Sequence, residues 1–206
     1  MADIRRLSIF PLGGALLLPR AYLPLHIFEP RYRAMVKDAL VRERRIGMIQ
    51  PRGAADADRL YDIGCIGKII DVQAMEDGRY NLVLEGLTRF RLMRELDLPT
   101  AFRQIEASTD GFDADGDEPD PLAHVIRAAI EREARLMAEA RGYEIDWDQV
   151  NRLDDEGLVN GIAQVAPFDI AAKQALLEAE GLPARADLLL QLLSFMTPDA
   201  EGPTLQ

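Results

Sequence analysis

The sequence predicts an α+β protein, in which a small, mostly antiparallel β-sheet or pseudo-barrel with one inserted helix precedes an α-helical bundle. Short apolar runs with two-residue alternation fill the first hundred residues. An acidic stretch with glycines and prolines follows at 109–121, and helical periodicity dominates 122–198. We therefore expect a β subdomain at 1–108, a solvated linker at 109–121, a helical bundle at 122–198 and a flexible tail at 199–206.

The composition is that of an ordinary globular protein, with 48% hydrophobic and 29% charged residues. A single cysteine, Cys65, excludes an internal disulfide framework and favours a reducing, cytoplasmic location. The N-terminal apolar run superficially resembles a signal peptide, but Pro11 and Gly13–Gly14 interrupt it. We expect neither export nor a membrane partner.

Charge is unevenly distributed along the chain. Residues 1–108 carry 17 Lys and Arg against 14 Asp and Glu, whereas residues 109–206 carry 7 against 21. An acidic second half repels a phosphate backbone, so we do not expect nucleic acid to bind there.

The segment "LPLHIFEPRYRAMV" predicts a strand that turns into a helix. Alternation places Leu23, Leu25 and Ile27 on one face of the strand, and Pro24, His26 and Phe28 on the other. Pro30 suits the first helical position, which leaves Glu29 near the cap. The residues Tyr32, Met35, Val36, Ala39 and Leu40 form the predicted buried stripe. We expect His26 and Glu29 to be substantially buried and to hold this corner through hydrogen bonds.

Further strands precede the acidic stretch. "RLSIF" predicts an early strand, and "CIGKIIDVQAM" and "RYNLVLEG" flank Asp77–Gly78, a strong hairpin signal. "LTRFRLMREL" and "FRQIEAS" predict two more strands. Six short strands with one helix are typical of a small antiparallel sheet or pseudo-barrel.

The helical region predicts four helices. Asp120–Pro121 suggests the start of the first, which ends at Gly142. The other three are expected near 155–166, 170–180 and 184–196, and Asp169 is a candidate cap for the second of them.

The residues carry no assembled catalytic or metal motif. His26, Glu29, Cys65 and His124 could in principle converge on a metal, but the sequence has no CxxC, HExxH or His-rich cluster. The chain lacks a G-x-S-x-G elbow and a Walker A loop, and Cys65 lies in a predicted strand. We therefore expect no enzyme activity, no catalytic residue, no metal and no cofactor.

The segments "IFPL", "LPLHIFEPRYRAM", "DIGCIGKII", "DGRYNLVLEGLTRFRL" and "KQALLEAEGLPARADLLLQLL" resemble, in order, the N-terminal substrate-binding domain of Lon-type proteases. The resemblance implies a PUA-like β pseudo-barrel followed by a helical bundle. It also implies recognition of unfolded or tagged polypeptide for an attached ATPase and protease. The residues that carry the motif are Pro24, His26, Glu29, Pro30, Arg31, Tyr32, Gly64, Asp77, Gly78, Gly86, Arg89 and Phe90.

Neither the ATPase nor the protease module is recognisable in these residues, so we expect a stand-alone bacterial Lon-N-like protein that works with a protease or chaperone partner. The sequence does not identify the polypeptide-binding residues or the oligomeric state. Family members often have glycine after the first-turn proline, where this chain has Pro19–Arg20. If the turn requires positive φ, Arg20 must adopt it.

Two alternative functions remain open at this stage. The first is RNA or nucleotide binding, because several arginines surround the first predicted helix: Arg31, Arg33, Arg42, Arg44 and Arg45. A solvated helix face explains them better, because stacking aromatics are not interleaved with them. The second alternative is an unrecognised hydrolase, which would need a cleft with strongly perturbed titratable groups.

Overall fold

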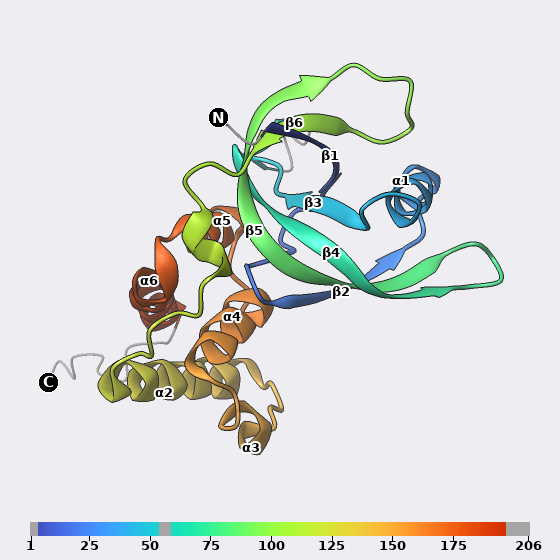
Figure 1. The fold of residues 1–206 in the computed structure, drawn as a ribbon. Coiled ribbons are helices and arrows are strands. Elements are labelled where there is room, and N and C mark those ends of the chain that lie inside the picture. The colour runs from blue at the N-terminus through green and yellow to red at the C-terminus, as the bar shows by residue number, and fades with distance from the viewer. Residues whose placement is uncertain (1–3, 54–58, 197–206) are drawn as a thin grey trace, which may run out of the picture. The chain divides into compact units, whose positions relative to one another are not determined.

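The computed structural model describes residues 4–53 and 59–196. The chain divides into two compact units (Figure 1). Unit 1 contains the residues up to Glu118 together with Pro167–Glu178, and unit 2 contains Pro119–Ala166 and the residues from Ala179 onward. The chain therefore passes between the units three times: residues Pro167–Glu178 return to unit 1, and the chain then enters unit 2 again.

Unit 1 is built on a six-stranded sheet whose strands run in the order β2-β5-β4-β3-β1-β6. An additional pairing between β5 and β6 closes five of the strands into a ring and leaves β2 outside it. All neighbours are antiparallel except β1 and β3. The expected pseudo-barrel is thus confirmed. The strands are β1 (Ile4–Pro11), β2 (Tyr22–Ile27), β3 (Arg45–Ile49), β4 (Ile63–Ala74), β5 (Tyr80–Leu96) and β6 (Gln104–Ser108).

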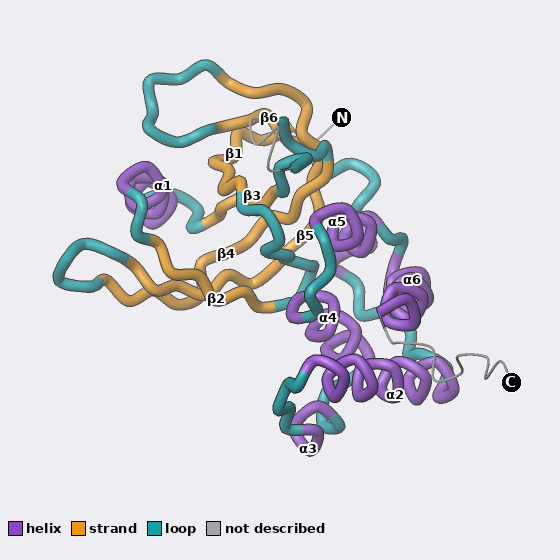
Figure 2. Tube along the Cα trace, turned by 180° about the vertical axis from the view of Figure 1, so that it is seen from behind, coloured by secondary structure: helices purple, strands orange, loops and turns teal. Residues whose placement is uncertain are grey.

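The β5 strand makes the ring closure possible because it is long enough to pair with β2 and β6 in succession as well as with β4 (Figure 2). Its first part pairs with β2, its last part pairs with β6, and β4 follows it for most of its length. Register shifts interrupt both the β4 and the β6 ladders, and such bulges bend and twist a strand. The two strands expected at "RYNLVLEG" and "LTRFRLMREL" are therefore one continuous strand.

The ring encloses an apolar core around Phe90 and Ile105, both fully buried. Gly64 pairs with Phe90 across β4 and β5, and a Cβ at Gly64 would overlap the Phe90 ring and the carbonyl oxygen of Met48. Glycine at this position lets the aromatic ring lie directly against the backbone.

The inserted helix α1 spans Pro30–Leu40 and begins at the predicted proline. Tyr32, Met35, Val36 and Ala39 are buried, which confirms the stripe except that Leu40 is only partly covered. The Tyr32 ring lies 4.3 Å from the Phe10 ring between centroids, so it anchors α1 to β1.

Two short segments complete unit 1. The 3₁₀ helix η2 (Asp113–Gly116) lies in the stretch that we expected to be a solvated linker, yet Phe112 is buried and the Asp115 side chain is only 6% exposed. Helix α5 (Ile170–Glu178) lies against β4. Its Gln174 accepts a hydrogen bond at 3.2 Å from Gln50 at the end of β3.

Unit 2 is helical, with α2 (His124–Arg141), α3 (Trp147–Val150), α4 (Asp155–Val165) and α6 (Gly181–Met196). The expected helix start at Asp120–Pro121 is wrong, because α2 begins at His124. The N–H of Leu122 donates instead to the Asp155 carboxylate at 2.8 Å, which holds the approach to α2 against the start of α4. Gly142 ends α2 with a φ of 69°, as predicted, and Asp169 caps α5 by accepting from the N–H of Ala172 at 2.7 Å.

Unit 2 also contains a buried polar contact between α4 and α6. Arg185 donates to the Asn160 amide oxygen at 3.0 Å, and both residues are only 3% exposed. Within the described ranges 4–53 and 59–196, every helix is too short or too polar to span a bilayer.

Candidate functional site

The strand β2 is the open edge of the sheet in unit 1. Among the described strands it pairs with β5 alone, from Tyr22 opposite Glu85 to Ile27 opposite Tyr80. An edge strand presents unpaired main-chain groups that another extended chain can pair with. This edge is therefore a candidate binding surface.

Alternation along β2 gives this edge an apolar outer face. Leu23, Leu25 and Ile27 turn inward, and Ile27 is buried. Tyr22, Pro24, His26 and Phe28 alternate with them and are all exposed, Tyr22 by 58% and Phe28 by 59%. We call these four residues the β2 stripe. At about 3.3 Å per residue it is about 20 Å long, which matches an extended segment of about six residues.

An open groove of about 360 Å³ lies beside the stripe on the same sheet. Pro24 and His26 line it from β2, Val83 and Asn81 from β5, and Asp71 from β4. The register places Val83 opposite both Pro24 and Asp71, so these three residues form one row across the sheet. The groove therefore has an apolar side next to β2 and a polar side next to β4.

Main-chain groups of β2 also point to its outer side. The N–H of Gly86 donates to the carbonyl oxygen of Ala21 at 2.9 Å. In an antiparallel pair the main-chain groups of successive residues alternate in direction, so those of Tyr22, Pro24 and His26 turn away from β5. Pro24 has no N–H and interrupts this edge at its middle. The edge thus offers the N–H of His26 as a donor and the carbonyl oxygens of Pro24 and His26 as acceptors.

The expectation that His26 is buried is wrong, because its side chain is exposed on the outer face of β2. Its Nδ1 lies 2.7 Å from the Asn81 side-chain oxygen, and its Nε2 lies 3.4 Å from Nη1 of Arg79. Ile27 and Tyr32 are the buried residues of this corner, and alternation along β2 turns His26 to the opposite, exposed face. His26 is held by hydrogen bonds, but on the surface.

Glu29 also differs from the expectation, because 40% of its side chain is exposed. It is the N-cap residue of α1, but its carboxylate accepts from Arg31 at 2.9 Å and makes no cap hydrogen bond. The Arg31 guanidinium lies 4.5 Å above the Tyr32 ring. Burial raises the pKa of the Tyr32 hydroxyl. At this corner, the exposed Glu29–Arg31 ion pair covers the buried ring of Tyr32.

The predicted Asp77–Gly78 hairpin is confirmed. Gly78 has a φ of 81°, and its N–H donates to the carbonyl oxygen of Met75 at 2.9 Å. Asp77 accepts from the N–H and from the guanidinium of Arg79, and this main-chain hydrogen bond holds the pKa of the Asp77 carboxyl below its ordinary value. The turn places Arg79 beside His26.

Gly86 fixes the loop that leads into β2. A Cβ at Gly86 would overlap the carbonyl oxygen of Leu18, and the N–H of Arg20 donates to the Gly86 carbonyl oxygen at 2.8 Å. Arg20 has a φ of 59°, so it adopts the left-handed conformation that the turn was expected to require. Gly86 therefore sets the position at which β2 begins.

The arginines around α1 are engaged in local contacts. Arg42 pairs with Asp38 at 2.9 Å, Arg45 pairs with Glu43 at 3.2 Å, and Arg44 donates to the carbonyl oxygen of Ile69 at 3.1 Å. This arrangement favours a structural role over a stacking nucleic-acid surface. Cys65 is buried in β4, and within the part of the chain that the structure describes no group of His, Cys, Asp and Glu side chains is arranged to hold a metal.

Sequence reasoning did not identify the β2 stripe as a binding surface. The period-two pattern placed Pro24, His26 and Phe28 on one face, and the prolines suited an edge or barrel-rim position, but the pattern did not show which face is exposed. Edge position depends on long-range pairing, and its only local signal here is Pro24 inside the strand.

Comparison with known proteins identifies relatives along nearly the whole chain. A family model described as "ATP-dependent protease La (LON) substrate-binding domain" matches residues 6–194. A Lon protease of Anaeromyxobacter dehalogenans is 30% identical over 91% of this chain, and Lon protease 2 of Myxococcus xanthus is 29% identical over the same share. The chain spans about a quarter of the length of these relatives, 23% in both cases.

Two solved structures share the fold. The N-terminal domain of a Mycobacterium avium complex Lon protease superimposes with a TM-score of 0.63 at 21% identity, covering 92% of this chain and 98% of that one. A Lon N-terminal domain protein from Xanthomonas campestris has the same TM-score at 24% identity, covering 94% and 99%. At this level of identity the two structures establish the fold alone.

Proposed function

Because this chain belongs to the LON substrate-binding domain family, we propose that it acts as a non-enzymatic polypeptide-binding module and that the β2 stripe is its binding surface. The ligand is an extended segment of unfolded polypeptide with aromatic or aliphatic side chains. The observation that carries the proposal is the row of exposed residues, Tyr22 to Phe28, on the open edge of the sheet.

Two features of the edge favour strand addition as the binding mode. The N–H of His26 and the carbonyl oxygens of Pro24 and His26 point to the open side of β2, so a bound segment gains main-chain hydrogen bonds that do not depend on its sequence. The exposed rings of Tyr22 and Phe28 give side-chain contacts at the two ends of the stripe. A module of this kind selects extended, apolar segments and tolerates many sequences.

Pro24 limits how a peptide pairs with the edge. Because it has no N–H, the ladder is broken at its centre, and such a break protects an edge strand from pairing with another copy of itself. We therefore expect weak, reversible binding that depends on the aromatic contacts.

The test is a fluorescence anisotropy titration with a labelled eight-residue peptide of alternating valine and threonine. The double variant Tyr22→Ser/Phe28→Ser should weaken binding by at least about tenfold, because burying one aromatic side chain stabilises by about 1.5–3 kcal/mol. The matched control is Val41→Ser, which removes an 83% exposed apolar side chain at the end of α1 and should leave binding unchanged.

A second probe tests strand addition itself. N-methylation of alternate peptide residues removes the donors on one side of the bound strand only. Methylation in one register should abolish binding, whereas methylation in the other register should not. Unchanged binding with both methylated peptides would exclude main-chain pairing, and unchanged binding by the double variant would place the surface elsewhere.

A further inference from the structure

A cavity of about 390 Å³ lies in unit 1 where β1 and β3 separate. The parallel ladder joins only Ile9–Pro11 of β1 to Gly47–Ile49 of β3. Before that point, β1 pairs with β6 while β3 pairs with β4. The two strands therefore diverge towards their N-terminal ends, and the end of α1 and its turn into β3 complete the wall of what we call the β1–β3 pocket.

Main-chain groups of β1 face this pocket. The N–H of Ile9 donates to the carbonyl oxygen of Arg103 at 3.0 Å. Because main-chain directions alternate in an antiparallel pair, the N–H groups of Arg6 and Ser8 turn away from β6. On that side β1 is not paired with β3 at these residues, so the N–H groups of Arg6 and Ser8 point into the pocket.

The lining also carries an excess of positive charge. It includes four arginines (Arg5, Arg6, Arg42 and Arg45) against two carboxylates (Asp38 and Glu43). Both carboxylates are already in ion pairs, Asp38 with Arg42 and Glu43 with Arg45. Residues 1–108, which supply all of the lining except Thr109, carry 17 Lys and Arg against 14 Asp and Glu, so the pocket lies in the basic part of the chain.

Among the arginines that line the pocket, Arg6 has a guanidinium that neutral hydrogen bonds hold in a fixed orientation. Its Nε donates to the Gln104 side-chain oxygen at 2.6 Å, and Gln104 is only 3% exposed and donates in turn to the Thr100 hydroxyl at 3.1 Å. Within the described ranges, no carboxylate forms an ion pair with Arg6. The guanidinium is therefore oriented by a neutral amide, while Glu106, the residue opposite Arg6 on β6, accepts hydrogen bonds from Arg94 instead.

The inner wall of the pocket is apolar, formed by buried residues that include Leu7, Ile66 and Ala107. The volume falls in the range of about 300–1,000 Å³ that is typical of small-molecule sites. An arginine fork with adjacent N–H donors matches the planar or tetrahedral oxygens of an anion. We propose that the β1–β3 pocket binds a small ligand with one anionic group, carboxylate or phosphate, on an apolar body.

The test is isothermal titration calorimetry at constant ionic strength with three probes: phenyl phosphate, phenylacetate and the neutral benzyl alcohol. We expect one-to-one saturable binding of at least one anion at submillimolar concentration and at least about tenfold weaker binding of the alcohol. The two anions separate phosphate from carboxylate chemistry. Arg6→Gln should weaken the binding of that anion, measured as an increase in Kd, by about tenfold or more.

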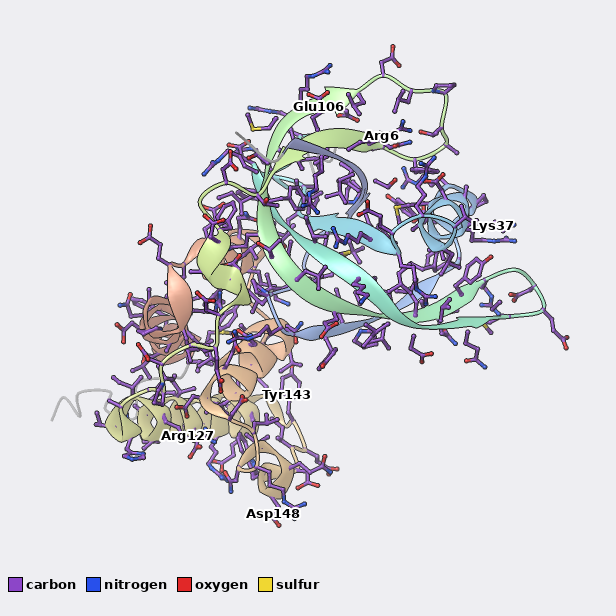
Figure 3. All side chains as sticks on the ribbon, viewed as in Figure 1. Arg6, Lys37, Glu106, Arg127, Tyr143 and Asp148 are labelled. Carbon is purple, nitrogen blue, oxygen red and sulfur yellow. The ribbon has the colours of Figure 1, made fainter. Side chains whose placement is uncertain are left out.

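Two further variants distinguish specific binding in the pocket from general electrostatic attraction of an anion to the positively charged surface. Lys37→Gln removes the same charge from an exposed position on α1 that does not line the pocket (Figure 3), and it should change the Kd by less than about twofold. Thr109→Trp fills the rim of the pocket while all charges remain and should abolish binding. Circular dichroism melting curves verify that each variant is folded.

Three results would overturn the proposal: no saturable binding of either anion at millimolar concentration, an equal loss in Lys37→Gln and Arg6→Gln, or full binding by Thr109→Trp. The Tyr22→Ser/Phe28→Ser protein should bind the anion normally, so failure here and failure of the polypeptide-binding proposal are distinguishable.

Discussion

Arg89 on β5 and Asp115 on η2 form a buried, bidentate ion pair, with 2.7 Å between Nη2 and Oδ1 and 3.0 Å between Nε and Oδ2. Their side chains are only 8% and 6% exposed. Arg89 also donates to the carbonyl oxygen of Leu177 at 3.3 Å, and its guanidinium lies 4.9 Å from the Phe112 ring centroid. One buried cation thus connects β5, η2 and the end of α5.

Removal of one partner of this ion pair should be strongly destabilising. Asp115→Ala leaves the Arg89 charge buried without its carboxylate, at a cost of about 3–5 kcal/mol in the free energy of unfolding. The double variant Arg89→Met/Asp115→Ala should be destabilised by less than the sum of the two single changes, because no uncompensated charge remains. Urea denaturation of the four proteins measures this coupling, and strict additivity would contradict it.

Gly86→Ala should destabilise unit 1 by several kcal/mol or prevent folding, because the added Cβ meets the carbonyl oxygen of Leu18, a backbone atom that cannot move away cheaply. The matched control is Gly161→Ala in α4, where a Cβ has open space. That change should stabilise by about 0.5–1 kcal/mol, because alanine favours a helix interior over glycine. Thermal melts followed by circular dichroism compare the two, and equal effects would exclude the steric explanation.

The conformation of Arg20 can be isolated by comparing two substitutions that both remove its guanidinium. Glycine accepts a φ of 59° without strain, whereas valine does not. Arg20→Val should therefore be less stable than Arg20→Gly by about 1–3 kcal/mol in chemical denaturation. Equal stability of the two variants would mean that the turn changes its conformation when Arg20 is lost.

The stability of unit 2 should depend on Asp155 at acidic pH. The hydrogen bond from Arg127, at 2.7 Å, and the N–H of Leu122 lower the pKa of the Asp155 carboxyl in the folded protein. A carboxyl whose pKa is lower in the folded state stabilises the fold above its unfolded pKa, and this contribution is lost as the pH falls through the folded pKa.

Asp155→Asn should therefore reduce stability at neutral pH and flatten the decline below about pH 4, where the wild-type carboxyl takes up a proton. Asp148→Asn, at an exposed position in α3 (Figure 3), serves as the control and should leave the pH profile close to wild type. Unfolding by urea at a series of pH values gives the measurement. Parallel profiles for wild type and Asp155→Asn would contradict the assignment.

Much of the local structure of this chain follows from short-range chemistry. Pro30 at a first helical position, the stripe that begins at Tyr32, the turn at Asp77–Gly78 and the cap at Asp169 are each confirmed. Each depends on residues within one or two turns of one another, so a single stretch of sequence contains the whole signal.

Most of the wrong expectations concern features beyond the local sequence. His26 was expected to be buried, but it lies on the exposed face of β2. The stretch expected to be a solvated linker is mostly exposed, but it also contains Asp115, whose partner Arg89 lies 26 residues earlier. The helix expected to begin at Asp120–Pro121 begins at His124 instead, and the N–H of Leu122 donates to the Asp155 carboxylate. A carboxylate in an acidic stretch has the same local sequence whether it meets water or a buried arginine.

By itself, the sequence determined the fold class, the kind and order of most elements, and the resemblance to the substrate-binding domain that the comparisons establish. Only the tertiary structure decided that β5 closes the ring with β6, that β2 is left as the edge, and that α5 belongs with the sheet. The physical reason is the range of the interactions. Periodicity and capping act within a few residues, whereas strand pairing and buried charge pairing join groups whose proximity exists only in the folded chain.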